Sequence, residues 1–175
     1  MTEEVFKYPA PSRWGVFTLT ASKKGLKTIS FPLRRGASGN QKLVARPERI
    51  PKNIFQIFLQ TESWLKSYLQ GKIPHSKRVP IDDSSYTVSQ ARMLKQLVRV
   101  PFGETRSYAW LARECGIPKG LRATGQLLKA NPLPILFPCH RIIRKDGSLG
   151  GFSQGTVWKR KLIAHERVSA KKRFV

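Results

Sequence analysis

The sequence predicts an α+β protein that combines a small N-terminal part, built from β-strands and a helix, with a mostly helical C-terminal part. Three observations support this prediction. Apolar and polar residues alternate through much of residues 14–33, which is typical of strands. Apolar residues recur at helical spacing in residues 53–70 and through most of residues 87–130. The chain has 175 residues, enough for two small domains that each bury a modest core.

Two neighbouring segments near the N-terminus predict a β-hairpin. Residues 14–22, WGVFTLTAS, alternate apolar and polar side chains, and residues 26–33, LKTISFPL, partly do the same. The Lys-Lys-Gly sequence at residues 23–25 forms a short turn between them, with a glycine available for positive φ. Residues 34–50 are polar and interrupted by Gly and Pro, so they predict a loop or an irregular strand.

Residues 53–70 predict a helix, with a proline before it and a glycine after it, where helix start and stop signals belong. Two prolines interrupt residues 71–85, which we interpret as the connection to the C-terminal part. We therefore expect an N-terminal α/β domain over residues 1–84 and a C-terminal domain over residues 85–175. The apolar face of the predicted helix comprises Ile54, Ile57, Phe58, Leu65, Tyr68 and Leu69.

Three helices are predicted at the start of the C-terminal part. The first covers residues 87–100 and ends at Pro101. Ser107 is the expected N-cap of the second, which ends at Gly116, and the third covers residues 121–130. Two short helices joined by a glycine-containing turn predict a helix-turn-helix, whose second helix would lie against DNA. An ordinary helical hairpin gives the same pattern, so this hypothesis depends on the charge of the chain.

After residue 130 the sequence is less regular until a last predicted helix. Residues 135–143, ILFPCHRII, form a short apolar run that a proline interrupts. Residues 145–147, Lys-Asp-Gly, predict a hairpin-like turn, and the glycine-rich segment 150–155 follows. The final helix is predicted over residues 156–166, before a basic tail.

The net charge points to a polyanionic partner. The chain has 33 Lys and Arg against 10 Asp and Glu, which gives a formal net charge of +23. Nucleic acid is the first candidate partner, an anionic membrane surface the second, and a solvated surface without a specific partner the third. No apolar run is long enough to span a bilayer, and the N-terminus lacks the apolar core of a signal peptide. We therefore expect a cytoplasmic protein associated with the nucleoid.

Cys139 is a candidate nucleophile. It lies between Pro138 and His140, with Arg141 next, and nearby positive charge favours the nucleophilic thiolate. Cys115 lies on the apolar face of a predicted helix, which indicates an inert buried thiol. Two cysteines and three scattered histidines do not predict a disulfide framework or a structural zinc site.

These residues leave three kinds of thiol chemistry open: a cysteine protease, a redox thiol and an alkyl acceptor. A protease needs a remote histidine, and His75 and His165 are the candidates. No dithiol redox motif is present.

A long segment around Cys139 resembles a known family. Residues 131–155, NPLPILFPCHRIIRKDGSLGGFSQG, closely resemble the active-site segment of the O6-alkylguanine-DNA alkyltransferases, or methylated-DNA–protein-cysteine methyltransferases. The resemblance extends upstream through VPFGETRSYAWLA and LRATGQLLKANP, and downstream to His165-Glu166. It covers the C-terminal half in one continuous register, which is far more specific than a short motif. It implies a ribonuclease-H-like N-terminal domain and a winged helix-turn-helix in the C-terminal domain.

The resemblance implies direct DNA repair, in which an alkyl group passes irreversibly from O6-alkylguanine to the protein in a single turnover. Cys139 would accept the alkyl group, and a relay of His140 and Glu166, through a water, would keep it as a thiolate. Asn131 would brace the turn that holds the cysteine. Tyr108 would contact the flipped nucleotide and help protonate the departing guanine. The repair of O4-alkylthymine stays open.

The resemblance also implies residues for DNA and for the base. The partner would be double-stranded DNA with an alkylated guanine, bound in the minor groove by a monomer; cooperative binding of several copies stays open. Arg122 would fill the gap left by the flipped nucleotide. The other expected DNA contacts are Ser107, Tyr108, Ala123, Thr124, Gly125, Lys129 and Arg141. The expected pocket residues are Ile142, Phe152, Ser153, Gln154 and Gly155.

Two departures from the family pattern concern the pocket. Phe152 stands where many members have Tyr, and Gln154 where others have Gly or a bulky residue. The N-terminal half has no cysteine, so we expect neither the zinc that some members carry nor any other cofactor. The main alternative function is that of the alkyltransferase-like proteins, which bind alkylguanine without transfer and have another residue in place of the cysteine.

Overall fold

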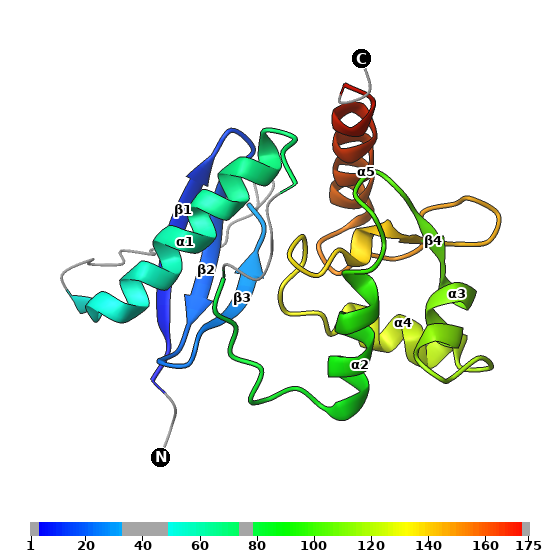
Figure 1. Ribbon diagram of the computed structural model, residues 1–175, viewed down its shortest axis with the longest axis horizontal. Coiled ribbons are helices and arrows are strands. Elements are labelled where there is room, and N and C mark those ends of the chain that lie inside the picture. The colour runs from blue at the N-terminus through cyan, green and yellow to red at the C-terminus, as the bar shows by residue number, and fades with distance from the viewer. Residues whose placement is uncertain (1–3, 33–48, 74–78, 173–175) are drawn as a thin grey trace. The chain divides into compact units, whose positions relative to one another are not determined.

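The computed structural model describes residues 4–32, 49–73 and 79–172, and the chain divides into two compact units, Met1–Ser84 and Ser85–Val175 (Figure 1). The α+β class predicted from the sequence is confirmed, since both units contain helices and strands. His75 and nearly all of the loop predicted over residues 34–50 lie outside the described residues. No described helix is long and apolar enough to cross a membrane.

The first unit contains an antiparallel sheet of three described strands in the order β1-β2-β3: β1 (Phe6–Ser12), β2 (Gly15–Ala21) and β3 (Leu26–Ser30). The predicted hairpin is confirmed as β2 and β3, which pair Leu19 with Ile29. The register shifts between Thr20 and Ala21, next to the turn, where a β-bulge accommodates an additional residue.

Strand β1 was not predicted from the sequence, because it contains Pro9 and Pro11, and proline within a segment usually argues against a strand. The strand pairs antiparallel with β2 along its whole length. Proline has no N–H to donate to a sheet, so prolines are tolerated in a strand that has one free edge. The two prolines are two residues apart, so their nitrogens lie on the same side of β1. The backbone pairing of β1 with β2 is kept along the whole strand.

Helix α1 (Lys52–Leu69) packs on β1 and β2, as Figure 1 shows. Its bounds agree with the prediction to within one residue, because the apolar face is long and both ends are marked. Ile54, Phe58 and Leu65 are buried on this face. Tyr8 of β1 stacks on Phe58, with ring centroids 5.2 Å apart.

The second unit is mostly helical and has its own core. Its helices are α2 (Val88–Leu97), α3 (Tyr108–Glu114), α4 (Leu121–Lys129), the short 3₁₀ helix η3 (Cys139–Arg141) and α5 (Thr156–Lys171). The central buried cluster comprises Met93, Leu94, Leu97, Val100, Leu111, Cys115, Leu128, Cys139 and Ile142. Both cysteines therefore belong to the same apolar core.

The predicted starts of the helices in this unit agree with the structure. Thr87 caps α2 in a reciprocal capping box with Gln90. Ser107 caps α3 by accepting from the backbone N–H of Trp110 at 3.1 Å, as predicted. Helix α5 is longer than predicted and continues past Glu166 to Lys171, because no Gly or Pro interrupts the residues that follow.

A two-stranded parallel sheet brings distant segments of the second unit together. Strand β4 (Arg106–Ser107) pairs with β5 (Ile142–Ile143), so that Arg106 faces Ile142 and Ser107 faces Ile143. Strand β4 leads directly into α3, and β5 directly follows η3. The pairing therefore fixes the first residue of α3, Tyr108, near the segment that carries Cys139.

Candidate active site around Cys139

The turn before Cys139 is organised by one amide side chain, that of Asn131. Its Nδ2 donates to the carbonyl of Phe137 at 2.8 Å, and its Oδ1 accepts from the N–H of Leu133 at 3.1 Å. The same Nδ2 lies 3.0 Å from Sγ of Cys139. Asn131 is buried, so these bonds form away from water. One side chain therefore shapes the turn and also contacts the sulfur.

Inside this turn, Ile135 has a left-handed backbone conformation with φ of 76°. This backbone conformation is unfavourable for a β-branched residue, and adopting it costs about 1–3 kcal/mol. The side chain of Ile135 is buried, and the N–H of Phe137 donates to the carbonyl of Leu133 across it. Packing and hydrogen bonds thus hold strained backbone next to the cysteine.

Cys139 itself is 3% exposed and begins η3 directly after Pro138. Burial raises the pKa of its thiol to about 11, and it outweighs the hydrogen bond from Asn131 and the positive charge of Lys159, which both favour the thiolate. Burial therefore opposes the thiolate, while Asn131 and Lys159, which stabilise the anion, are already in place.

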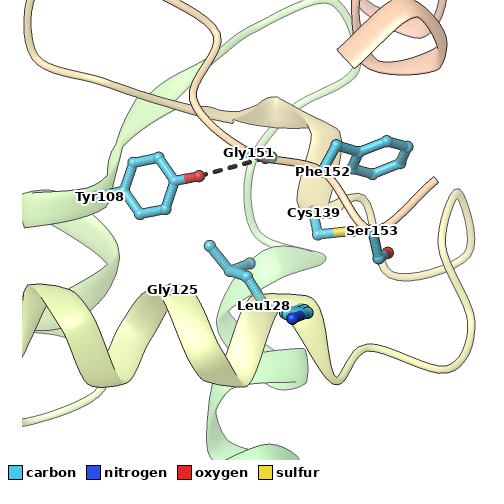
Figure 2. A pocket seen from close by; sticks show the side chains of 8 residues that line it. Tyr108, Gly125, Leu128, Cys139, Gly151, Phe152 and Ser153 are labelled. Carbon is cyan, nitrogen blue, oxygen red and sulfur yellow. Dashed lines mark hydrogen bonds between the residues drawn. The ribbon is translucent and has the colours of Figure 1, made fainter. Parts of the chain in front are cut away.

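A cavity of about 410 Å³ opens beside the sulfur. Figure 2 shows Cys139 at this cavity together with Tyr108, Phe152 and Ser153, which also line it. The volume falls within the range of pockets that hold small organic ligands, about 300–1,000 Å³. The lining residues are Tyr108, Gly125, Leu128, Lys129, Cys139, Gly151, Phe152 and Ser153.

Tyr108 presents a phenol to this cavity. Its hydroxyl donates to the carbonyl of Gly151 at 3.4 Å, a long hydrogen bond that Figure 2 marks. Burial raises the pKa of Tyr108 above its ordinary value; the charge of Arg144 opposes this shift, and ionisation of Cys139 adds to it. The hydroxyl therefore keeps its proton and remains available as a donor.

Glu166 of α5 holds the residues that follow the cysteine. Its Oε1 lies 2.8 Å from Nε2 of His140, and Nε of Arg141 donates to its Oε2 at 2.8 Å. The backbone N–H of Gly103 also donates to Oε2, at 3.0 Å. Burial alone would raise the pKa of Glu166, but the hydrogen bonds and charges of His140 and Arg141 hold it well below its ordinary value. The carboxylate is thus a fixed anion in the interior.

His140 is fully buried beside this carboxylate. Burial lowers the pKa of His140, although the hydrogen bond to Glu166 raises it. The lowered pKa favours the neutral ring, in which one nitrogen can accept a proton. The predicted relay from Glu166 through His140 has its first link in this geometry. The second link, through a water to Cys139, stays a prediction.

Comparison with known proteins places this arrangement in a family. Residues 88–168 match the family model described as 6-O-methylguanine DNA methyltransferase, DNA binding domain. The methylated-DNA–protein-cysteine methyltransferase of Cricetulus griseus is 34% identical over 164 residues, which span 88% of this chain and 78% of that protein. The chain belongs to the methylated-DNA–protein-cysteine methyltransferase family.

Solved structures of methyltransferases share the fold. The O6-methylguanine methyltransferase of Mycobacterium tuberculosis superimposes with a TM-score of 0.72 at 28% identity, covering 95% of this chain and 94% of that chain. The structure of the same organism's protein in complex with DNA gives a TM-score of 0.69 at 28% identity, covering 94% and 93% of the two chains. The family resemblance seen in the sequence is thereby confirmed.

Helix α4 of this methyltransferase exposes some of the predicted DNA contacts and buries another. Arg122 and Ala123 are exposed, and Gly125 and Lys129 line the cavity. Thr124 is fully buried, and its hydroxyl donates to the carbonyl of Gly120 at 3.0 Å. The side chain of Thr124 therefore faces the interior of the unit, and a contact of this residue with DNA stays a prediction.

Arg141 also differs from the prediction. It was expected to contact DNA, but its guanidinium is buried and donates to both carboxylate oxygens of Glu166 and, at 2.6 Å, to the carbonyl of Val100. All of its nitrogens are thereby engaged inside the methyltransferase. Arg141 pairs with Glu166 in the interior, because a buried charge needs a counter-ion.

The pocket was predicted only in part. Phe152 and Ser153 line it as expected. Ile142 is fully buried in the core, and Gln154 and Gly155 are not among the lining residues. Gly155 instead precedes α5 with φ of 91°. The sequence analysis missed Leu128 and Gly151, which line the cavity because α4 and the glycine-rich loop converge there.

Lys159 is the other residue that the sequence analysis missed. It lies on α5, is 1% exposed, and its charge acts on Cys139. The signal was present in the sequence: residues 159, 162, 163 and 166 recur at helical spacing on the buried face of α5. A lysine at the start of such a face predicts a buried amine.

Proposed function

We propose that this methyltransferase repairs DNA directly, by transferring an alkyl group from O6 of guanine in double-stranded DNA to Sγ of Cys139. The observation that carries the proposal is a buried cysteine at a small cavity, with an amide donor on its sulfur and a phenol in the cavity wall. Membership of the methyltransferase family supports the same reaction.

The nucleophile in this proposal is the thiolate of Cys139. His140, neutral and held by Glu166, accepts the thiol proton through a water, and Asn131 donates a hydrogen bond to the resulting anion. Sγ then attacks the saturated carbon of the alkyl group, for which a soft thiolate is well suited. A new S–C bond forms while the C–O6 bond breaks.

The leaving group takes the electron pair of the C–O6 bond. The departing guanine is protonated with the help of the Tyr108 hydroxyl, which keeps its proton because burial raises its pKa. The products are an unmodified guanine in DNA and an S-alkylcysteine in the protein. A thioether is chemically stable, and none of the side chains described at the site can cleave it, so each molecule acts once.

An alkyl group within the base stack is out of reach of a cysteine buried beside a cavity. We propose that the nucleotide is extruded into the cavity, at a cost of a few kcal/mol. The exposed Arg122 at the start of α4 would fill the gap in the duplex, with α4 in the minor groove. Helices α3 and α4 would act as a winged helix-turn-helix, the first unit would be a ribonuclease-H-like domain, and the protein would bind DNA as a monomer.

The test is intact-mass analysis after mixing the protein with a duplex that carries O6-methylguanine. We expect the mass of one added methyl group, mapped to Cys139 by peptide analysis, and no addition in Cys139→Ala. Cys115→Ser is the matched control, because Cys115 is also a buried free thiol of the same core. This variant is expected to transfer normally.

An unchanged mass together with tight binding to the same duplex would contradict the proposal. The protein would then be a lesion binder that recognises alkylguanine without transfer. Substitution of Cys139 would in that case leave both binding and function unchanged.

A further inference from the structure

A buried lysine lies close to the site without a part in the reaction described above. Lys159 of α5 is 1% exposed and is among the largest fully buried side chains of the described residues. A buried ammonium costs several kcal/mol unless partners in the interior compensate its charge. The partners of Lys159 therefore indicate what the charge does.

The direct contacts of Lys159 are with two residues of the pocket wall. Its Nζ donates to the carbonyl of Gly151 at 3.1 Å and lies 5.6 Å from the centroid of the Tyr108 ring. The phenol of Tyr108 donates to the same Gly151 carbonyl. Lys159 does not line the cavity itself, so it acts on the cavity from behind this wall.

Neither contact supplies a negative charge. Within residues 4–32, 49–73 and 79–172, no carboxylate forms an ion pair with Lys159. Glu166, which shares the buried face of α5, is engaged by His140 and Arg141. Among the groups near Lys159 that can become anions, the thiol of Cys139 is the one whose charge favours the protonated lysine.

Lys159 and Cys139 influence each other electrostatically. The charge of Lys159 favours ionisation of the thiol, against the burial that raises its pKa to about 11. Burial lowers the pKa of Lys159 to about 8. The negative charge of an ionised Cys139 raises this pKa, and the positive charge of Arg144 lowers it further. Each of the two groups therefore stabilises the charged form of the other.

We infer that Lys159 is a positioning residue for alkyl transfer: its buried ammonium holds Gly151 and Tyr108 in the pocket wall and stabilises the Cys139 thiolate by its charge. Near neutral pH Lys159 keeps its proton, because its pKa of about 8 lies above that pH, and the thiol proton leaves through His140. The inference rests on the proposed function, since it names a residue that assists the same nucleophile. The other titratable and charged groups around this pair are Tyr108 of α3, His140 and Arg141 of η3, Arg144 after β5 and Glu166 of α5.

The test measures the ionisation of Cys139 without DNA. The rate at which iodoacetamide modifies Cys139 is followed from about pH 6 to about pH 10 and quantified on the Cys139 peptide, because the thiolate is the reactive form. We expect Lys159→Met to react about tenfold more slowly near neutral pH, which corresponds to a rise of about one unit in the thiol pKa. Methyl transfer from the damaged duplex should fall by at least as much.

Two further variants make the comparison specific. Lys159→Gln keeps a donor for the Gly151 carbonyl but removes the charge, so its pH profile should shift as that of Lys159→Met does. Lys161→Met is the matched control, because Lys161 lies two residues further on α5 and is exposed. Its profile and its transfer rate are expected to equal those of the unmodified protein.

Thermal melting checks that the variants fold; if Lys159→Met unfolds, Lys159→Gln carries the comparison. A wild-type pH profile in the folded charge-removing variants would overturn the inference, whatever their transfer rates. The proposed function is tested separately, because it fails if the unmodified protein reacts with iodoacetamide at Cys139 but accepts no methyl group from DNA.

Discussion

At the scale of single residues, the geometry of the sulfur depends on Asn131. Its amide contacts the turn at two points and the sulfur at a third, and the left-handed Ile135 lies between those two points in the chain. The amide therefore helps to hold a backbone conformation that this isoleucine would not adopt in isolation. Position and reactivity of the cysteine are coupled through one side chain.

Asn131→Ala should lower both stability and reactivity. Buried hydrogen-bonding groups of the turn lose their partner, which costs about 1–3 kcal/mol in the free energy of unfolding, measured by urea denaturation. Methyl transfer should fall by about tenfold or more, because the thiolate loses its amide donor. Asn53→Ala is the control, since Asn53 is exposed at the start of α1 and should change stability by less than about 0.5 kcal/mol. Equal stability of the two variants would contradict this account.

At the scale of elements, Glu166 joins α5 to two other segments. Its carboxylate binds His140 and Arg141 of η3 and the N–H of Gly103, which precedes β4. Gly103 has φ of 84°, and a Cβ there would lie 2.8 Å from that of Ala170, so α5 and this loop are in close contact. The carboxylate thus fixes the position of η3, and with it the backbone of Cys139.

Glu166→Gln should destabilise the protein and remove part of its acid sensitivity. Breaking the buried pair leaves Arg141 without its counter-ion, which costs about 3–5 kcal/mol near neutral pH. The folded-state pKa of Glu166 lies below the ordinary 4.5, so the unfolded chain takes up this proton first as the pH falls. Its contribution is therefore complete above about pH 4.5 and is lost below it.

The measurement is the free energy of unfolding at several pH values. Below about pH 4.5, the unmodified protein should lose stability more steeply than Glu166→Gln. Glu104→Gln serves as the control, because Glu104 forms an exposed ion pair with Arg106 and should contribute less than about 1 kcal/mol. Parallel pH curves for the unmodified protein and Glu166→Gln would refute the role of the carboxylate.

Elements with a long apolar period were predictable from the sequence, and elements made by distant pairing were not. Helix α1 and the β2–β3 hairpin follow from local patterns. Strand β1 was hidden by two prolines, and β4 and β5 have two residues each, too few for a period. Their pairing exists because the folded chain brings residues 106 and 142 together.

The same distinction applies to the site. The nucleophile and its neighbours in the chain were predictable from a motif. The burial of Thr124 and Arg141 was not, because it depends on contacts with Gly120 and Glu166 that no local pattern encodes. Their assignment to DNA came from the family resemblance of the surrounding segments, which does not show which way a side chain points.

At the scale of the whole molecule, the excess of positive charge dominates. The 33 Lys and Arg exceed the 10 Asp and Glu throughout the chain. Such a field attracts any nucleic acid, damaged or not, and the attraction is screened by salt. The charge therefore supports association with DNA in general, whereas the cavity beside Cys139 supports selection of the alkylated base.

Binding to an undamaged duplex should weaken steeply with salt. Displacement of counterions from about six phosphates would reduce affinity by about a thousandfold between about 50 and 200 mM salt. Arg122→Ala should reduce the slope of log affinity against log salt concentration by about one. Lys95→Ala removes the same charge from an exposed position on α2 and should leave the slope unchanged. A fluorescence-anisotropy titration at several salt concentrations measures both; equal slopes for the two variants would exclude a phosphate contact by Arg122.

Alkylation should make the protein less stable. The sulfur loses its hydrogen bond from Asn131 and gains a substituent next to the core cluster. We expect a loss of about 1–3 kcal/mol, seen as a lower melting temperature of the methylated protein in calorimetry. Unreacted protein incubated with an undamaged duplex is the control. An unchanged or higher melting temperature after methylation would contradict this expectation.

Cys139 belongs to the reactive cavity and to the hydrophobic core at once. The stability of the folded state is therefore expected to differ between molecules that have transferred an alkyl group and molecules that have not. Alkylated molecules would then unfold more often than unreacted ones. Cellular machinery that recognises unfolded chains would remove them preferentially, and no dedicated receptor for the alkyl group would be needed. We therefore expect the position of this one sulfur atom, in both the cavity and the core, to favour removal of the used protein.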